Sequence, residues 1–267
     1  MKVTVIGFWG GYPAVSEATS SYLVEHDGFQ LLVDCGSGAL AQLQKYAKPE
    51  EIDAMILSHY HHDHVADVGV FQYARLIQTH LGNAVKELSI YGHTYDQESF
   101  NKLTHKGITK GIEYDPSQKL EVGPFTIEFM KTKHPVVCYA MRISAGNQTV
   151  VYTADSSYLE EFVSFSEEAD LLICECNFYA NQDGRGAGHM TSTEAGTLAS
   201  KASVKHLMLT HLPHYGEHQQ LVEEAATHYR GTLTHLPHYG EHQQLVEEAA
   251  THYRGTLTLA ESGYVWE

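Results

Sequence analysis

The letters SHYHHDH, which end at His64, constrain this chain more than any other stretch. They follow directly on the apolar run Ala54–Leu57, which has the length and composition of a buried strand. Side chains of an extended chain alternate between its two sides, so His59 and His61 share one side and a turn returns Asp63 toward them. Imidazole and carboxylate groups at this density are the ligands that zinc and similar metals prefer. The stretch predicts a metal site at a strand end, and an accidental histidine-rich loop is the weaker alternative.

Short β-type runs alternate with helical runs along the chain, which predicts an α/β protein. We expect a single domain over residues 1–267, with two sheets and helices outside them. A hairpin turn is expected at His26–Gly28, because HDG separates two strand-like runs. Strands are expected at Val3–Gly7, Ser21–Val24, Gln30–Asp34, Ala54–Ser58, Glu87–Tyr91, Phe125–Thr132, Cys138–Ile143, Thr149–Thr153, Leu171–Cys174 and Val204–Leu209. Helices are expected at Ala39–Tyr46, Val68–Leu81, Thr94–Leu103, Tyr158–Phe165, Ser192–Ser200 and Glu217–Tyr229.

The composition argues against binding of nucleic acid through a basic surface. The formal net charge is −16, and a negative surface repels phosphate backbones. The segment Lys102–Lys110 is the nearest approach to a basic cluster, and we interpret it as solvated surface. Hydrophobic residues make up 43% of the chain, as in globular proteins and not in disordered ones.

Cysteine usage and the first residues favour a cytoplasmic protein. All four cysteines lie in or beside apolar, strand-like runs, so buried free thiols in a reducing compartment are expected; they are Cys35, Cys138, Cys174 and Cys176. The opening MKVTVIGFWGG lacks the pattern of a secretory leader, and no apolar run has the length of a membrane span. We therefore expect no membrane association.

The spacing His-x-His-x-Asp-His resembles the metallo-β-lactamase superfamily, whose two-metal sites lie at the rim of a four-layer αββα sandwich. The same resemblance implies further ligands at strand ends: His134 in TKHPVVCYAMRI, Asp155 in VVYTADSS and His211 in LMLTHL. It implies that one metal takes His59, His61 and His134, that the other takes Asp63, His64 and His211, and that Asp155 bridges both. Two divalent ions are expected, zinc first, with manganese or iron as alternatives. The nucleophile would be a bridging hydroxide, which makes Asp63 a candidate catalytic residue.

Other segments resemble the ribonuclease Z-like branch of this superfamily. The stretch GFWGGYPAVSEATSSYLVE resembles the opening loop and strand of that branch, and LLVDCGSG resembles its second strand. The resemblance implies that Asp34 in the second stretch supports a ligand histidine. GHMTSTEAG resembles the segment that supplies a non-ligand histidine, here His189, near the leaving group. The alternative for His189 is that it is an ordinary residue without a chemical role, placed just before the helix cap at Thr191 or Ser192. The resemblance implies a phosphodiesterase or ribonuclease Z-like hydrolase and a homodimer.

The branch has a feature that this chain lacks. Members that mature transfer RNA carry a long Gly/Pro-rich arm after the segment that corresponds to HPVVCYAMRI, whereas here SAGNQ turns directly into the next strand. A small phosphodiester or a short RNA is therefore the expected substrate. A lactone or thioester hydrolase on the same site is one alternative, and a non-catalytic metal-dependent binding protein is another.

Several residues near these motifs have a simpler interpretation. We interpret His62 as a solvent-facing spacer, His93 as a satisfied loop histidine and Asp67 as the cap of the helix that starts near Val68. For Trp9 and Tyr12, stacking on a base and packing over the sheet end remain open alternatives.

Residues 210–233 recur without change as residues 234–257. A single copy completes the expected fold, so one copy is superfluous and must loop out, pair with a sheet edge or exchange with another subunit. A recent tandem duplication, or an error in the sequence, explains the identity better than selection does. His211 follows the apolar run VKHLML and is favoured as the ligand; His235 follows the weaker run YRGTL and is the substitute.

Overall fold

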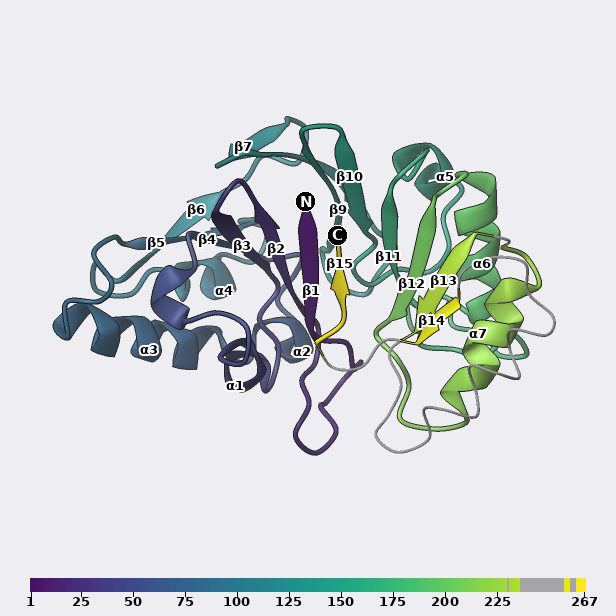
Figure 1. Ribbon diagram of the computed structural model, residues 1–267, viewed down its shortest axis with the longest axis horizontal. Coiled ribbons are helices and arrows are strands. Elements are labelled where there is room, and N and C mark those ends of the chain that lie inside the picture. Colours follow the sequence, from purple (N-terminus) through teal and green to yellow (C-terminus); the bar gives the residue numbers. More distant parts are fainter. Residues whose placement is uncertain (230, 236–256, 260–262) are drawn as a thin grey trace. The chain divides into compact units, whose positions relative to one another are not determined.

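The computed structural model describes residues 1–229, 231–235, 257–259 and 263–267 (Figure 1). The chain divides within β8 (Phe125–Lys131) into two compact units. The first unit is Met1–Glu128 with Val265–Glu267, and the second is Phe129–Tyr264. The expectation of a single domain over residues 1–267 stays a prediction.

The first unit is built on one mixed sheet. Its strand order is β15 (Val265–Trp266), β1 (Lys2–Gly7), β2 (Ser21–His26), β3 (Phe29–Val33), β4 (Ala54–Ile56), β5 (Leu88–Gly92) and β6 (Thr109–Glu113). Strands β15 to β3 pair antiparallel, and β3 to β6 pair parallel. The carboxyl ends of β3, β4 and β5 therefore meet at one edge, which is where side chains for binding collect in parallel sheets.

The β2–β3 hairpin turns at the predicted position. Asp27 and Gly28 both have left-handed backbone, with φ 47° and 78°. A two-residue turn with two positive φ values has the twist that adjoining strands require, and glycine adopts it without a steric cost.

Helices and turns of the first unit pack their apolar side chains against this sheet. They are α1 (Ala39–Leu43), the 3₁₀ turn η1 (Pro49–Glu51), α2 (His62–Val65), α3 (Val68–His80) and α4 (Gln97–Asn101). Leu43 of α1 and Phe71 of α3 are fully buried with Leu32, Met55 and Ile90 of the strands. This core holds in place the strand ends from which the SHYHHDH segment departs.

The second sheet is mixed as well (Figure 1). Its order is β14 (Leu257–Leu259), β13 (Thr232–His235), β12 (His206–Thr210), β11 (Leu171–Glu175), β10 (Gln148–Tyr152), β9 (Tyr139–Ala145), β8 and β7 (Leu120–Val122). From β10 to β14 all pairs are parallel. The carboxyl ends of β10, β11 and β12 meet at one edge of the second unit.

Helices α5 (Glu161–Phe165), α6 (Ser192–Lys201) and α7 (His218–Ala226) belong to the second unit, where α6 packs on β11, β12 and α7. The side chain of Thr191 caps α6 by accepting from the backbone N–H of Glu194, as expected of a capping residue. A Cβ atom placed on Gly196 would lie 2.3 Å from the carbonyl oxygen of Ala225. The close approach of α6 and α7 therefore requires glycine at position 196.

The predicted α/β class is confirmed, and each predicted strand and helix overlaps one in the structure. The prediction for Lys102–Lys110 was incomplete: its lysines are exposed, but Thr109 is buried and begins β6. Strand β7 was missed because it is short. The two C-terminal strands that the structure describes enter different sheets, β14 the second and β15 the first. All four cysteines are buried and free, as predicted.

The repeat contributes strands to the edge of the second sheet. The first copy supplies α7 and half of β13, the second copy begins with the other half, and β14 follows as the next parallel strand. Most of the second copy, residues 236–256, lies outside the described residues. Among the helices that the structure describes, none combines the length and the apolar character needed to cross a bilayer.

We predict that Gly196→Ala destabilises the protein by about 1–3 kcal/mol, because the new methyl group overlaps the α7 backbone. Gly69 near the start of α3 is the matched control, since a Cβ there meets no atom within 4 Å. Gly69→Ala should leave stability unchanged or raise it, because alanine favours helix. Urea denaturation monitored by circular dichroism measures both, and equal midpoints for the two variants would contradict the packing argument.

Candidate functional site

The SHYHHDH segment leaves β4 and enters α2, and it gathers four polar side chains within the first unit. His59 and His64 are fully buried, and their ring centroids are 4.2 Å apart. The ring of His61 lies 4.8 Å from that of His59. Asp63 places its Oδ2 atom 3.8 Å from Nε2 of His64. The sequence motif thus becomes one compact cluster of potential metal ligands.

The carboxylate of Asp34, at the end of β3, orients this cluster. Asp34 is fully buried, and its Oδ2 atom lies 2.7 Å from His64 Nδ1. Ser58 donates to the same carboxylate through its backbone N–H and its hydroxyl, each at 2.8 Å. The Ser58 hydroxyl also lies 3.0 Å from His59 Nδ1. With Nδ1 engaged in this way, Nε2 is the atom that both histidines present to a metal.

The second unit gathers its own cluster at the carboxyl ends of β10 and β12. Asp155 is 2% exposed, and its Oδ2 atom lies 3.3 Å from His211 Nε2 and 3.7 Å from His134 Nε2. His134 is held by its other ring nitrogen, 3.1 Å from the carbonyl oxygen of Gly188. A carboxylate oxygen beside two imidazole nitrogens suits a divalent cation. This donor set fits the bridging role that the resemblance implies for Asp155.

Both clusters contain residues with a left-handed backbone conformation, which is strained for residues other than glycine. Asp34, Ala154 and His211 are non-glycine residues with φ values of 56°, 50° and 53°. Each lies at or next to a strand end that carries one of these side chains. Such conformations cost on the order of 1–3 kcal/mol and persist where surrounding structure enforces them, most often at functional sites.

The partly buried His189 pairs with Glu175, which the sequence did not predict. The Oε1 atom of Glu175 lies 2.9 Å from His189 Nδ1, and Glu175 is fully buried. The ring centroids of His134 and His211 lie 5.2 Å and 5.0 Å from that of His189. Potential ligand atoms of Glu175, His189 and His211 also lie within 4.8 Å of one another. A single acidic residue ending the apolar run LLICE is the signal that would have identified Glu175.

Strand register distinguishes the two repeat histidines. In the β12–β13 pair, Leu209 lies opposite His235, whereas His211 is two residues further along the chain, directly after the end of β12. Measured along the strand direction, the backbone of His235 therefore ends about 7 Å before the position of His211. This register supports His211 over His235, whose side chain is outside what the structure describes.

The first unit also contains three residues for which the sequence suggested simpler roles, namely His62, His93 and Asp67. His62 is exposed, and the carbonyl of the buried His93 accepts the Tyr60 hydroxyl at 2.6 Å. Asp67 precedes α3 as expected, but its side chain does not cap that helix; it accepts from the backbone N–H of Leu40 at 3.0 Å. The α1 segment therefore gains the bond expected for α3.

The thiols beside the second cluster are poor competitors for metal. Burial raises the pKa of Cys174 and of Cys176 well above the ordinary thiol value. Metals bind the thiolate, so neutral thiols in these positions leave ligation to imidazole and carboxylate groups.

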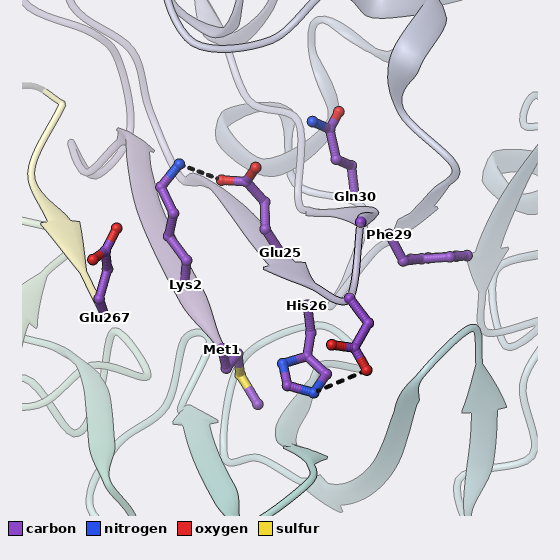
Figure 2. A pocket seen from close by; sticks show the side chains of 9 residues that line it. Met1, Lys2, Glu25, His26, Phe29, Gln30 and Glu267 are labelled. Carbon is purple, nitrogen blue, oxygen red and sulfur yellow. Dashed lines mark ion pairs between the residues drawn. The ribbon is translucent and has the colours of Figure 1, made fainter.

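A separate cavity of about 370 Å³ lies at the β2–β3 turn (Figure 2). Two ion pairs lie among its lining side chains: Lys2 with Glu25 at 2.7 Å and His26 with Asp27 at 3.7 Å. Phe29 begins β3, whereas Asp34 follows that strand. The cavity therefore lies at the opposite end of the sheet from the histidine cluster and takes no part in its chemistry.

We predict that Asp34→Asn lowers zinc affinity about 10–100-fold, because an amide has a single acceptor oxygen and cannot accept both from the Ser58 N–H at Oδ1 and from His64 at Oδ2. Competition with a zinc chelator measures the affinity, and circular dichroism checks the fold. Asp53→Asn is the control: Asp53 also accepts a backbone N–H, from Gln30 at 2.9 Å, at the other end of β3. Equal zinc affinity in both variants would contradict an orienting role for Asp34.

We predict that His211→Ala reduces the zinc content of the protein, whereas His235→Ala leaves it unchanged. His211 follows the end of β12, and its Nε2 atom lies 3.3 Å from Oδ2 of Asp155. Atomic absorption after dialysis gives the zinc per chain. Loss of zinc in His235→Ala alone would assign the ligand to the second copy.

Comparisons with known proteins agree with this chemistry. Residues 30–212 match the beta-lactamase superfamily domain, a range that includes His211 and stops before His235. The "Probable metallo-hydrolase YhfI" of Bacillus subtilis (strain 168) is 52% identical over 267 residues, which cover 100% of both chains. Its crystal structure has a TM-score of 0.88 and covers 99% of this chain and 98% of that chain. Ribonuclease Z of Haloferax volcanii is 25% identical over 298 residues, 86% of this chain and 91% of that protein. The chain has the predicted metallo-β-lactamase fold, and it belongs to the metallo-hydrolases of the beta-lactamase superfamily.

Proposed function

We propose that this protein is a dinuclear, zinc-dependent phosphodiesterase that acts on small phosphodiesters or short RNA. The observation that carries the proposal is the Glu175–His189 pair beside Asp155 and His211 in the second unit. This pair supplies a proton donor next to side chains that could bind a metal. Metal-assisted hydrolysis of an alkyl phosphodiester uses both kinds of group. The homodimer predicted from the sequence belongs to the same proposal.

The proposed metal ligands are those that the sequence resemblance implies: His59, His61, Asp63, His64, His134, Asp155 and His211. The support is the imidazole and carboxylate donor set within each unit, with Nδ1 of His59, His64 and His134 held by oxygen acceptors. Two such ions, when bound, supply an activated water and neutralise charge on the phosphoryl oxygens.

His189 is proposed to protonate the leaving alkoxide. Glu175 accepts from His189 Nδ1 and also from the backbone N–H groups of Ser156, at 2.9 Å, and of Asn177, at 3.3 Å. Three donors hold this carboxylate in place, so it sets the tautomer and the direction of the ring. Nε2 is then the atom that carries a proton to or from substrate. A metal on Nε2 would leave the bond between Nδ1 and Glu175 intact, as proposed for His64 and Asp34, so this bond suits either role. The proton-donor role is the one that the sequence resemblance implies for His189.

The connection between β9 and β10 favours a small substrate. Ala145 pairs with Gln148, so Gly146 and Asn147 alone form the turn, with Gly146 at φ 58°. This is the position at which the ribonuclease Z-like branch inserts its transfer-RNA arm. A tight hairpin there, together with a net charge of −16, supports a substrate that needs no extended electropositive surface.

The test of the proposal is hydrolysis by zinc-loaded protein of three substrates in parallel: a chromogenic phosphodiester, a lactone and a precursor transfer RNA. Turnover of the phosphodiester alone supports the proposal. Turnover of the lactone alone would overturn it in favour of an acyl hydrolase with the same ligands. Cleavage of the precursor transfer RNA would mean that another part of the protein replaces the missing arm.

We predict that His189→Ala lowers kcat about 10²–10⁴-fold for a phosphodiester with an alkyl leaving group. The loss should be much smaller for a p-nitrophenyl ester, because p-nitrophenolate leaves without a proton. His228→Ala is the control, since His228 is exposed at the end of α7 in the same unit. If the loss is equal for both leaving groups, His189 does not act as the acid.

A further inference from the structure

The loop of residues 8–19, between β1 and β2, is fixed at its base. Phe8 and Trp9 are buried, and their rings stack with centroids 5.2 Å apart. Their backbone N–H groups donate to the carbonyl of Ala18 at 3.1 and 3.3 Å, and the Trp9 indole donates to Glu17. These contacts join both ends of the loop. Packing, one of the two roles open for Trp9 from the sequence, is the role that the structure gives it.

The middle of the loop is fastened to the metal-binding motif. The backbone N–H of Gly11 donates to Oδ2 of Asp63 at 2.8 Å. Gly11 has φ 74°, and a Cβ atom placed on it would meet nothing within 4 Å. Glycine is therefore required here for its backbone conformation and not for space. The bond places the loop tip beside a carboxylate that the proposed function assigns to metal.

The tip itself presents apolar side chains to solvent. Tyr12 is 61% exposed, and Val15 is 93% exposed. The backbone of Tyr12 is held by its N–H, which donates to the carbonyl of Gly10 at 2.9 Å. A fixed backbone that exposes an aromatic ring next to a ligand cluster reduces the entropy lost when a planar group binds. The structure thus gives Trp9 and Tyr12 different environments, although the sequence did not separate them.

We propose that Tyr12 forms a base subsite, in which its ring stacks on the nucleobase of a nucleotide phosphodiester. The proposal rests on the proposed phosphodiesterase function and names its substrate class as nucleotides. Tyr12 directly follows the residue that binds Asp63, and a nucleoside places its base one sugar away from the phosphorus. Stacking needs no positive charge, so it suits a protein whose net charge is −16. Every base has a planar face, so this subsite recognises a nucleoside without selecting one base.

The test compares two substrates with the same leaving group in the zinc-loaded protein. Thymidine 5′-(p-nitrophenyl) phosphate carries a base, and methyl p-nitrophenyl phosphate carries none. Tyr12→Ala should raise KM about tenfold for the thymidine ester and leave KM for the methyl ester unchanged. Tyr12→Phe should keep the wild-type KM for both, because the ring and not the hydroxyl makes the contact.

Tyr73→Ala is the matched control, since Tyr73 on α3 is 60% exposed in the same unit. Calorimetric titration with thymidine 5′-phosphate and with inorganic phosphate adds a readout without turnover: Tyr12→Ala should weaken binding of the nucleotide alone. Equal effects of Tyr12→Ala on both esters, or none on either, would overturn the base subsite and leave the phosphodiesterase intact. Hydrolysis of neither ester by the wild-type protein would overturn the proposed function itself.

Discussion

The carboxylate of Asp34 is the interaction on which the candidate site in the first unit depends. It receives hydrogen bonds from the backbone N–H and hydroxyl of Ser58 and from His64, and it joins the end of β3 to the end of β4. A buried carboxylate is costly unless donors of this kind surround it. Because these donors belong to the SHYHHDH segment, the arrangement that stabilises Asp34 also sets the direction of the histidine rings. Folding and metal binding therefore depend on the same few bonds.

The second unit repeats this design with a different acid. Glu175 ends β11, is fully buried and receives bonds from Ser156, Asn177 and His189. As with Asp34, one buried carboxylate joins neighbouring segments at a strand end and fixes an imidazole through Nδ1. The outcome differs because Asp34 orients a proposed metal ligand, whereas Glu175 orients the proposed proton donor. Orientation through Nδ1 is thus a common solution for two chemical roles, since only the remaining nitrogen faces the chemistry.

The sequence predicts best what local pattern determines. Strands such as β3 and β10 are short, mostly apolar runs, and the HDG turn needs positive φ at Gly28, so both can be predicted from neighbouring residues. Strand β6 was obscured by the lysines around it, because an edge strand exposes much of its surface. The role of Glu175 was not predictable in this way, since its partners Ser156 and His189 lie 19 and 14 residues away. Bonds of this range depend on tertiary structure, which one sequence does not display.

The tandem repeat shows the limit of sequence identity as a guide to function. Strands β13 and β14 pair Leu233 with Leu257 and Thr234 with Thr258, so equivalent repeat positions lie opposite each other. The β12–β13 pair does not follow this rule, because Leu207, and not the equivalent Leu209, lies opposite Leu233. The duplicated letters therefore extend a parallel sheet edge, and the backbone of His235 does not reach the level of His211. Position at the strand end, set by register, makes one of two identical segments a candidate for metal binding.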